Sequence, residues 1–229
     1  MIQKINYLII FSIVVLLFYG VFHKILVFSP EYQSLSYNKK CYVLKNLTKS
    51  LMLFLILVFF MNDLFVPALY NTWNNEYANL FANAYVSNDF VGLLIVPKLP
   101  KSTKMHHIIS TSLLLYSYTI NFQEENVGRW MFIYTLMSTF PFLVNSYLGL
   151  RFIQTKENSN INIFIDKIRV MAYYIYLSTC FFNWLVHGLL VSNKIYNFNL
   201  ELPYIIYLFL LIPIINDDLI LLNWLYNKH

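Results

Sequence analysis

Cysteine, histidine and charged residues are all scarce in this chain of 229 residues. Its two cysteines, Cys41 and Cys180, cannot build the multi-bridge framework of a small secreted domain, and they show no zinc-binding spacing. Five histidines are too few for the His-rich boxes of membrane di-iron lipid hydroxylases, so we expect no metal and no other cofactor. Charged residues make up 12% of the chain, against about 25% in soluble domains, which excludes an ordinary soluble protein.

The chain consists instead largely of long apolar runs. Hydrophobic residues make up 59% of the chain and fall into blocks close to the roughly 20 residues that a helix needs to cross a bilayer. The sequence therefore predicts an all-α, multi-pass membrane bundle of about seven transmembrane helices, in which Pro141 should kink the fifth. The predicted spans are residues 5–22, 51–70, 78–97, 105–122, 130–150, 170–192 and 202–226.

The basic residues predict the orientation of these spans. Twelve of the 16 Lys and Arg residues fall in the loops after the first, third and fifth spans. Cytoplasmic loops are enriched in Lys and Arg, so we expect a lumenal N-terminus and a cytosolic C-terminus. The net charge of +5 is explained by these loops and by contacts with anionic lipids, so we expect no nucleic-acid partner.

One stretch concentrates polar residues inside an apolar run. A short basic loop, starting at Lys98, leads into the adjacent histidines His106 and His107. Residues three or four apart share a helix face, so the polar residues that follow should form a sector two stripes wide. Lipid offers them no hydrogen-bond partner, which predicts that the sector faces a cavity. Its predicted lining is Ser110, Thr111, Ser117, Tyr118 and Asn121.

Three other spans carry polar residues that fit the same cavity. Asp89 lies within the third span, where an unpaired charge would cost a few kcal/mol, so it either pairs with a histidine or is held by structural hydrogen bonds. Asn183 and His187 lie on one face of the sixth span and would line the cavity or join two helices. Asp217 is the cavity candidate in the last span, because it and Asp218 should not both face the interior from one helix.

These residues resemble the TRAM-LAG1-CLN8 (TLC) domain family. The resemblance rests on His106-His107 with the Lys-Leu-Pro-Lys-Ser-Thr run before them, on Ser117-Tyr118 and Asn121-Phe122 after them, and on Ser138-Thr-Phe-Pro-Phe-Leu-Val-Asn145. Lys45 to Ser50 resembles the start of the domain, and Asn223 to Tyr226 its end. The resemblance implies a TLC-like six-helix barrel within residues 35–229, preceded by an N-terminal transmembrane helix and linker in residues 1–34.

The family implies a lipid protein of the endoplasmic reticulum or another endomembrane. Its ceramide synthase branch joins a fatty acyl group from acyl-CoA to a sphingoid base. This chain matches the first half of the synthase motif, but Thr135-Leu136 and Ser138-Thr139 stand where the synthases have His-Asp and Ser-Asp. The match is therefore closer to the branch that is not ceramide synthase. Abundant Asn, Lys, Ile, Tyr and Phe suggest an AT-rich genome, such as that of a protist or a large DNA virus, whose protein would lie in a host or virion membrane.

Two functions follow as expectations. The first is a protein that binds or handles lipid in an intramembrane cavity and influences membrane lipid composition, including sphingolipid. The second is an acyl-CoA-dependent N-acyltransferase, in which His106 or His107 accepts the acyl group or deprotonates the amine and Asp89 orients the imidazole. A trafficking receptor is a weaker third hypothesis, and the histidines would be structural if both lay at the membrane interface. Lipid or acyl-CoA is the expected partner, and the formation of a homo-oligomer is left open.

Overall fold

The computed structural model describes residues 2–154 and 159–227, and every regular element in these residues is helical. The all-α fold predicted from the sequence is confirmed in this part of the chain. The elements are α1 (Ile2–Leu26), α2 (Pro30–Ser34), α3 (Tyr37–Tyr70), α4 (Asn75–Ile95), α5 (Lys101–Ser117), α6 (Val127–Met137), α7 (Phe142–Leu150), the short 3₁₀ helix η1 (Arg151–Ile153), α8 (Ser159–Tyr196) and α9 (Leu202–Asn227).

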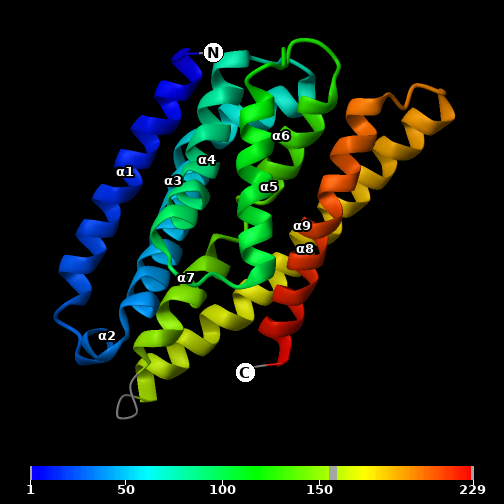
Figure 1. The fold of residues 1–229 in the computed structure, drawn as a ribbon. Helices are drawn as coiled ribbons and strands as arrows, with labels where there is room; N and C mark the ends of the chain where they lie inside the picture. The colour runs from blue at the N-terminus through cyan, green and yellow to red at the C-terminus, as the bar shows by residue number, and fades with distance from the viewer. Residues whose placement is uncertain (1, 155–158, 228–229) are drawn as a thin grey trace.

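The long helices run up and down alongside one another (Figure 1). Helix α1 descends from the N-terminus, α3 returns, α4 descends and α5 returns. The pair α6 and α7 then descends, α8 rises and α9 descends to the C-terminus, which lies at the opposite end of the bundle from the N-terminus. Helix α1 packs against α4 and α3, so the N-terminal helix is part of the bundle.

Four helices, α1, α3, α8 and α9, are long and apolar enough to cross a membrane. The pair α6 and α7 makes a fifth candidate span, bent by 50° where the chain passes Pro141, as the sequence predicted. The other two predicted spans, 78–97 and 105–122, correspond to α4 and α5. Helix α4 is too polar to qualify by itself, and α5 is short, with 17 residues.

The prediction of a loop over residues 23–50 is wrong in its second half. Helix α3 begins at Tyr37, so Lys45 and Lys49 lie on a helix, with only 4% and 5% of their surface exposed. Their charges face the interior of the bundle. A count of basic residues by position treats them as loop markers because it cannot tell an inward-facing lysine from a solvated one.

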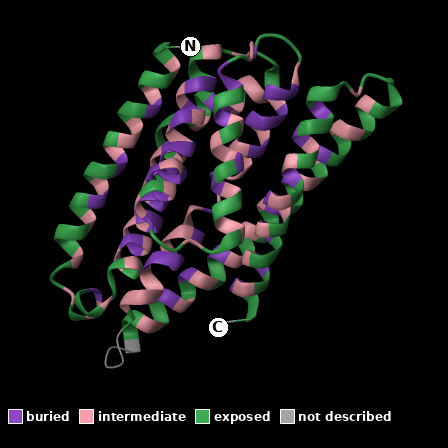
Figure 2. Cartoon of the chain, viewed as in Figure 1, coloured by how far each residue is buried: buried purple, intermediate pink, exposed green. Residues whose placement is uncertain are grey.

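The bundle buries several charged and polar side chains beside its apolar core and exposes many large apolar side chains. The buried residues include Lys45, Lys49, Asp89 and His107, whereas Phe59 is 68% exposed, and exposed surface follows the outer faces of the helices (Figure 2). A water-soluble domain has the opposite distribution, because exposing large apolar patches to water is unfavourable. The exposed apolar faces therefore match a hydrocarbon environment.

Asparagines shape the polar helix α4. The side chain of Asn74 caps its first turn by accepting hydrogen bonds from the next backbone amides. Farther along, Asn79 and Asn83 each donate to the carbonyl oxygen four residues earlier, at 2.5 and 2.7 Å. The hydroxyl of Tyr118, at the end of α5, donates to Asn83 at 2.6 Å. These bonds give the asparagines partners that lipid would not supply.

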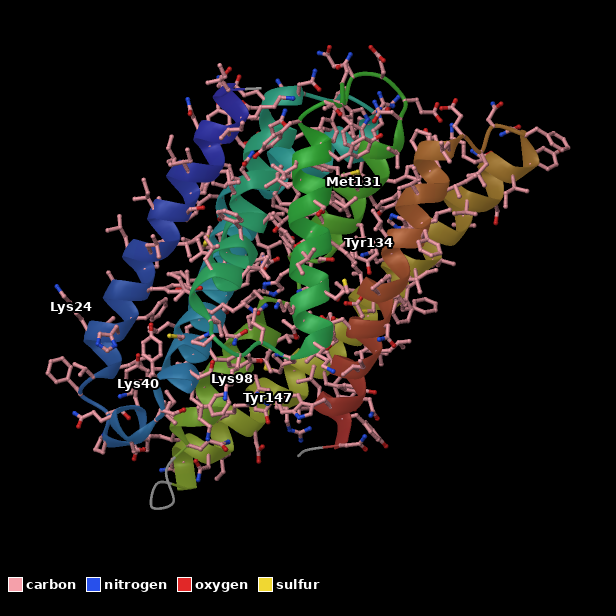
Figure 3. All side chains as sticks on the ribbon, viewed as in Figure 1. Lys24, Lys40, Lys98, Met131, Tyr134 and Tyr147 are labelled. Atoms are coloured by element: carbon pink, nitrogen blue, oxygen red, sulfur yellow. The ribbon has the colours of Figure 1, made fainter. Side chains whose placement is uncertain are left out.

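Basic residues gather at the end of the bundle where α9 finishes. Lys24, after α1, Lys40, at the start of α3, and Lys98, after α4, all lie toward that end (Figures 1 and 3). The structure thus brings these three lysines, which come from two of the predicted basic loops, to one end of the bundle.

Candidate functional site

A polar cavity of about 300 Å³ lies between α3, α4, α5, α7 and α9. Ligand pockets typically begin at about this volume. The charged residues that line it come from α3, α4, α5, η1 and α9, so folding must assemble the cavity from segments far apart in the sequence. They are Lys45, Lys49, Asp89, His106, His107, Arg151, Asp217 and Asp218.

Asp89 is held by two partners from neighbouring helices. The Lys49 ammonium lies 3.2 Å from its Oδ1 atom, and it also donates to the Tyr85 carbonyl oxygen at 2.5 Å. The Nε2 atom of His107 lies 3.7 Å from the same carboxylate oxygen, and its Nδ1 atom lies 3.1 Å from the Asp89 carbonyl oxygen. Because a carbonyl oxygen only accepts, Nδ1 of His107 carries a proton. His107 is thereby fixed on α4, with both ring nitrogens close to Asp89.

The second histidine faces a different carboxylate. The Nδ1 atom of His106 lies 3.3 Å from Oδ2 of Asp217, a distance suited to an ion pair, although the ring is not aligned for a hydrogen bond. The His106 side chain is 23% exposed, against 5% for His107. Adjacent helical residues point about 100° apart, which explains why the two rings meet different partners.

Asp218 also faces the interior, and the expectation that Asp217 and Asp218 would not both do so is wrong. The carboxylate of Asp218 accepts hydrogen bonds from the hydroxyl groups of Tyr134 (2.8 Å) and Tyr176 (2.6 Å). Figure 3 shows Tyr134 on α6 beside α9. The two aspartates diverge from α9, one toward α5 and the other toward α6 and α8, and the cavity is wide enough to be lined by both.

Two cations in the cavity have no such partner. In the part of the chain that the structure describes, neither Lys45 nor Arg151 forms an ion pair or donates a hydrogen bond. The Lys45 ammonium lies 5.9 Å from the centre of the Tyr42 ring. The Arg151 guanidinium lies 5.8 Å from the same ring and 4.3 Å from the ring of Trp224. Aromatic faces attract these cations but do not neutralise them.

A smaller, apolar cavity of about 70 Å³ adjoins the polar one, between α4, α5, α6 and α9. Tyr85, His106 and Ser138 line both cavities, so the two volumes meet at these three residues. The remaining lining of the apolar cavity is mostly hydrophobic, and it includes Phe81, Leu113, Leu114, Phe122, Met131, Phe132, Leu211 and Ile214.

The predicted site residues divide into three groups. Asp89, His106, His107 and Asp217 line the polar cavity, so the structure brings the predicted catalytic residues together. Ser110 and Ser117 line the apolar one. Of the predicted residues that the structure describes, five line neither cavity, and these are Thr111, Tyr118, Asn121, Asn183 and His187.

Asn183 and His187 join helices, which was the alternative left open for them. Asn183 donates to the Tyr134 carbonyl oxygen at 3.2 Å. In His187, Nδ1 lies 2.8 Å from the Asn183 carbonyl oxygen, while Nε2 lies 3.2 Å from both the Trp130 carbonyl oxygen and the Tyr207 hydroxyl group. Both nitrogens of this buried ring are therefore engaged within the contact between α6, α8 and α9.

Sequence reasoning missed Lys45, Lys49 and Arg151, because all three were assigned to loops. A signal for the two lysines was present. Tyr42, Lys45, Asn46 and Lys49 are spaced three or four residues apart, as on one helix face, and all of them line the polar cavity. Among the described residues, no group of three or more His, Cys, Asp or Glu side chains is placed to hold a metal ion.

Comparison with known protein families, with curated proteins and with solved structures finds no match to this chain.

Proposed function

We propose that this chain is a multi-pass membrane protein that holds an amphipathic lipid, with the polar head in the polar cavity and the hydrocarbon chain in the apolar one. The observation that carries the proposal is that the two cavities meet at Tyr85, His106 and Ser138. A polar cavity that shares three wall residues with a hydrophobic one matches a molecule with the same two halves, because polar groups stay solvated or paired while the chain is buried.

The placement in the membrane is part of this proposal. The alternating path of the helices supports seven crossings, with the bent pair α6–α7 counted as one (Figure 1). The basic end would then face the cytosol and the N-terminus the lumen of the endoplasmic reticulum or a related membrane. The histidine pair and the serine-threonine segment around Ser138 favour a TLC-like protein that influences membrane lipid composition.

Filling the apolar cavity should weaken lipid binding and leave the fold intact. In Leu113→Trp, the indole would occupy space that the hydrocarbon chain needs, so we expect at least about tenfold weaker binding, equivalent to roughly two CH₂ groups no longer buried. Native mass spectrometry of the purified protein, titrated with single-chain lipids in detergent micelles, measures the dissociation constant.

Leu115→Trp is the matched control for this substitution. Leu115 lies on the same helix but is 51% exposed and lines neither cavity, so its replacement should leave the affinity unchanged. Equal affinity in the two variants and the unmodified chain would show that the lipid does not use the apolar cavity.

A second candidate function is acyl-CoA-dependent N-acyl transfer. The observation that favours it is the position of His106 at the meeting point of the cavities, where the carbonyl carbon of a bound acyl thioester would lie between head and chain. With Asp217 at 3.3 Å to stabilise the imidazolium, His106 would take the proton of an attacking amine. The C–N bond forms, the C–S bond breaks, and the CoA thiolate leaves and takes up that proton.

This candidate predicts unequal roles for the two histidines. His106→Ala should lower the rate of N-acylation by about 10²- to 10⁴-fold, the usual contribution of a general base. His107→Ala should act mainly on stability, because its ring is fixed against Asp89. The assay uses labelled acyl-CoA and a sphingoid base with the purified chain. If His106→Ala still forms product at the original rate, this mechanism is wrong. If the intact chain forms no product but still binds lipid, the binding function is favoured.

A further inference from the structure

Two cations of the polar cavity have no carboxylate within ion-pair distance. Asp89 lies 3.2 Å from the Lys49 ammonium, and Asp217 lies 3.3 Å from the His106 ring. Asp218 is held by two tyrosine hydroxyl groups. The carboxylates of Asp89 and Asp217 attract Lys45 only from beyond ion-pair distance. Lys45 and Arg151 therefore remain as two cations without a direct counter-charge.

Burial makes the position of these two cations energetically unfavourable. Lys45 is 96% buried, with only 4% of its surface exposed, and burying an unpaired ammonium group costs several kcal/mol. The Nε atom of Arg151 is also buried without a hydrogen-bond partner. Both side chains line the same cavity and flank the same Tyr42 ring. These features suit the binding of an anion.

We infer that Lys45 and Arg151 form a subsite for a phosphate monoester, which makes the head of the bound lipid a terminal phosphate. This inference rests on the proposed lipid-binding function and specifies its ligand class. Two unpaired cations match the charge of a phosphate monoester, about −1.5 to −2 near neutral pH, better than the single charge of a carboxylate.

The two side chains suit complementary contacts with phosphate oxygens. A guanidinium group presents parallel N–H donors that match a phosphate bidentately, and it also stacks on aromatic rings, as Arg151 does against Trp224. The Lys45 ammonium adds a compact charge with three donors. The neighbouring Lys49 ammonium already contacts the Asp89 carboxylate and the Tyr85 carbonyl oxygen. It adds positive charge to the cavity but, unlike Lys45, it already has partners for its N–H groups.

The experiment compares four probes on the purified full-length chain by native mass spectrometry in detergent micelles. These are 1-oleoyl-glycerol 3-phosphate, 1-oleoylglycerol, oleate and glycerol 3-phosphate. We expect the phosphate lipid to bind at least about tenfold more tightly than the uncharged lipid with the same chain, which corresponds to one charge-assisted hydrogen bond. Oleate should bind with intermediate affinity, and glycerol 3-phosphate weakly, because it has no chain for the apolar cavity.

The cations are tested with Lys45→Gln and Arg151→Gln. Each should reduce the preference for the phosphate lipid over 1-oleoylglycerol by about tenfold. Lys104→Gln is the control, because Lys104 is an exposed lysine of the neighbouring α5 and does not line the cavity. Retained affinity for 1-oleoylglycerol also shows that each variant is folded.

The outcomes separate this inference from the proposed function. If both oleoyl lipids bind equally, or if neither Gln variant changes the preference, the phosphate subsite is refuted while lipid binding stands. If no lipid binds the intact chain, the proposed function fails. Glycerol 3-phosphate that binds as tightly as its oleoyl ester would support the phosphate subsite and overturn the lipid as the source of the phosphate.

Discussion

Replacing Lys49 with methionine should lower the free energy of unfolding by about 3–5 kcal/mol, the usual cost of removing one partner from a buried ion pair. Methionine keeps much of the apolar stem but leaves the Asp89 carboxylate, which is 5% exposed, with His107 alone at 3.7 Å. Unfolding followed by tryptophan fluorescence in mixed detergent micelles measures the change.

The reciprocal single variant and the double variant test whether the loss of stability comes from the Lys49–Asp89 pair. Asp89→Leu should cost a similar amount, since it leaves the Lys49 ammonium unpaired, whereas the double variant should cost less than either single one. Lys194→Met provides the contrast, because its partner Glu125 is 69% exposed and such surface pairs contribute at most about 1 kcal/mol. Additive losses in the double variant would mean that the two charges do not stabilise each other.

Gly149→Leu should separate α7 from α3 and lower the free energy of unfolding by about 1–3 kcal/mol, as overpacking does. A Cβ atom at Gly149 would lie 2.8 Å from Cγ and Cδ2 of Leu47 and 3.4 Å from the Val43 carbonyl oxygen, so the two helices touch where this residue has no side chain. The same unfolding measurement in micelles detects the loss.

Gly188→Leu is the control for the close approach. A Cβ atom there meets nothing within 4 Å, so the substitution should be neutral or should stabilise α8 by up to about 1 kcal/mol through helix propensity. Shortening the opposing side chain, in Gly149→Leu with Leu47→Ala, should recover part of the loss. If Gly149→Leu and Gly188→Leu behaved alike, steric contact between α3 and α7 would not explain the effect.

The fold could be predicted wherever apolarity extends over a whole helix. Residues 202–226 were predicted as a span and α9 covers Leu202–Asn227, since nothing polar interrupts the run until the aspartates. The break at Pro141 was equally accessible, because proline removes a backbone donor and clashes with the preceding turn. The start of α3 was missed because its first turns contain lysines, and hydropathy cannot separate a charge in a lined cavity from one in water.

Part of the candidate site could also be predicted, because polar residues are easily recognised inside an apolar run. An adjacent histidine pair inside an apolar run is conspicuous, and so is Asp89, so these three residues of the polar cavity could be chosen from type and position alone. The counter-charge of Asp89 could not be chosen, because Lys49 belongs to another helix and 40 residues separate the two. Pairing between helices depends on how the helices rotate against each other, which one sequence does not specify.

His187 shows why two alternatives were left open from the sequence. Its four-residue spacing from Asn183 predicted a shared face correctly, but the same face can meet a cavity or a neighbouring helix. In the structure it meets α6, and the ring is held by the Trp130 carbonyl oxygen and the Tyr207 hydroxyl group. Periodicity identifies which residues lie together on a helix, and packing decides what lies opposite them.

The asparagine-rich character of α4 has a consequence for how the chain is made. Entering a bilayer alone, this helix would carry Asn83 and Asp89 into hydrocarbon, which is costly for each polar group. Their partners, the Tyr118 hydroxyl of the α5 segment and the Lys49 ammonium of α3, belong to the segments synthesised just after and just before it. On the seven-span placement proposed above, helices α3, α4 and α5 should therefore leave the translocation channel as a set, with α4 retained until α5 has been synthesised. They would not follow the scheme in which each helix is stable in lipid before it meets the others.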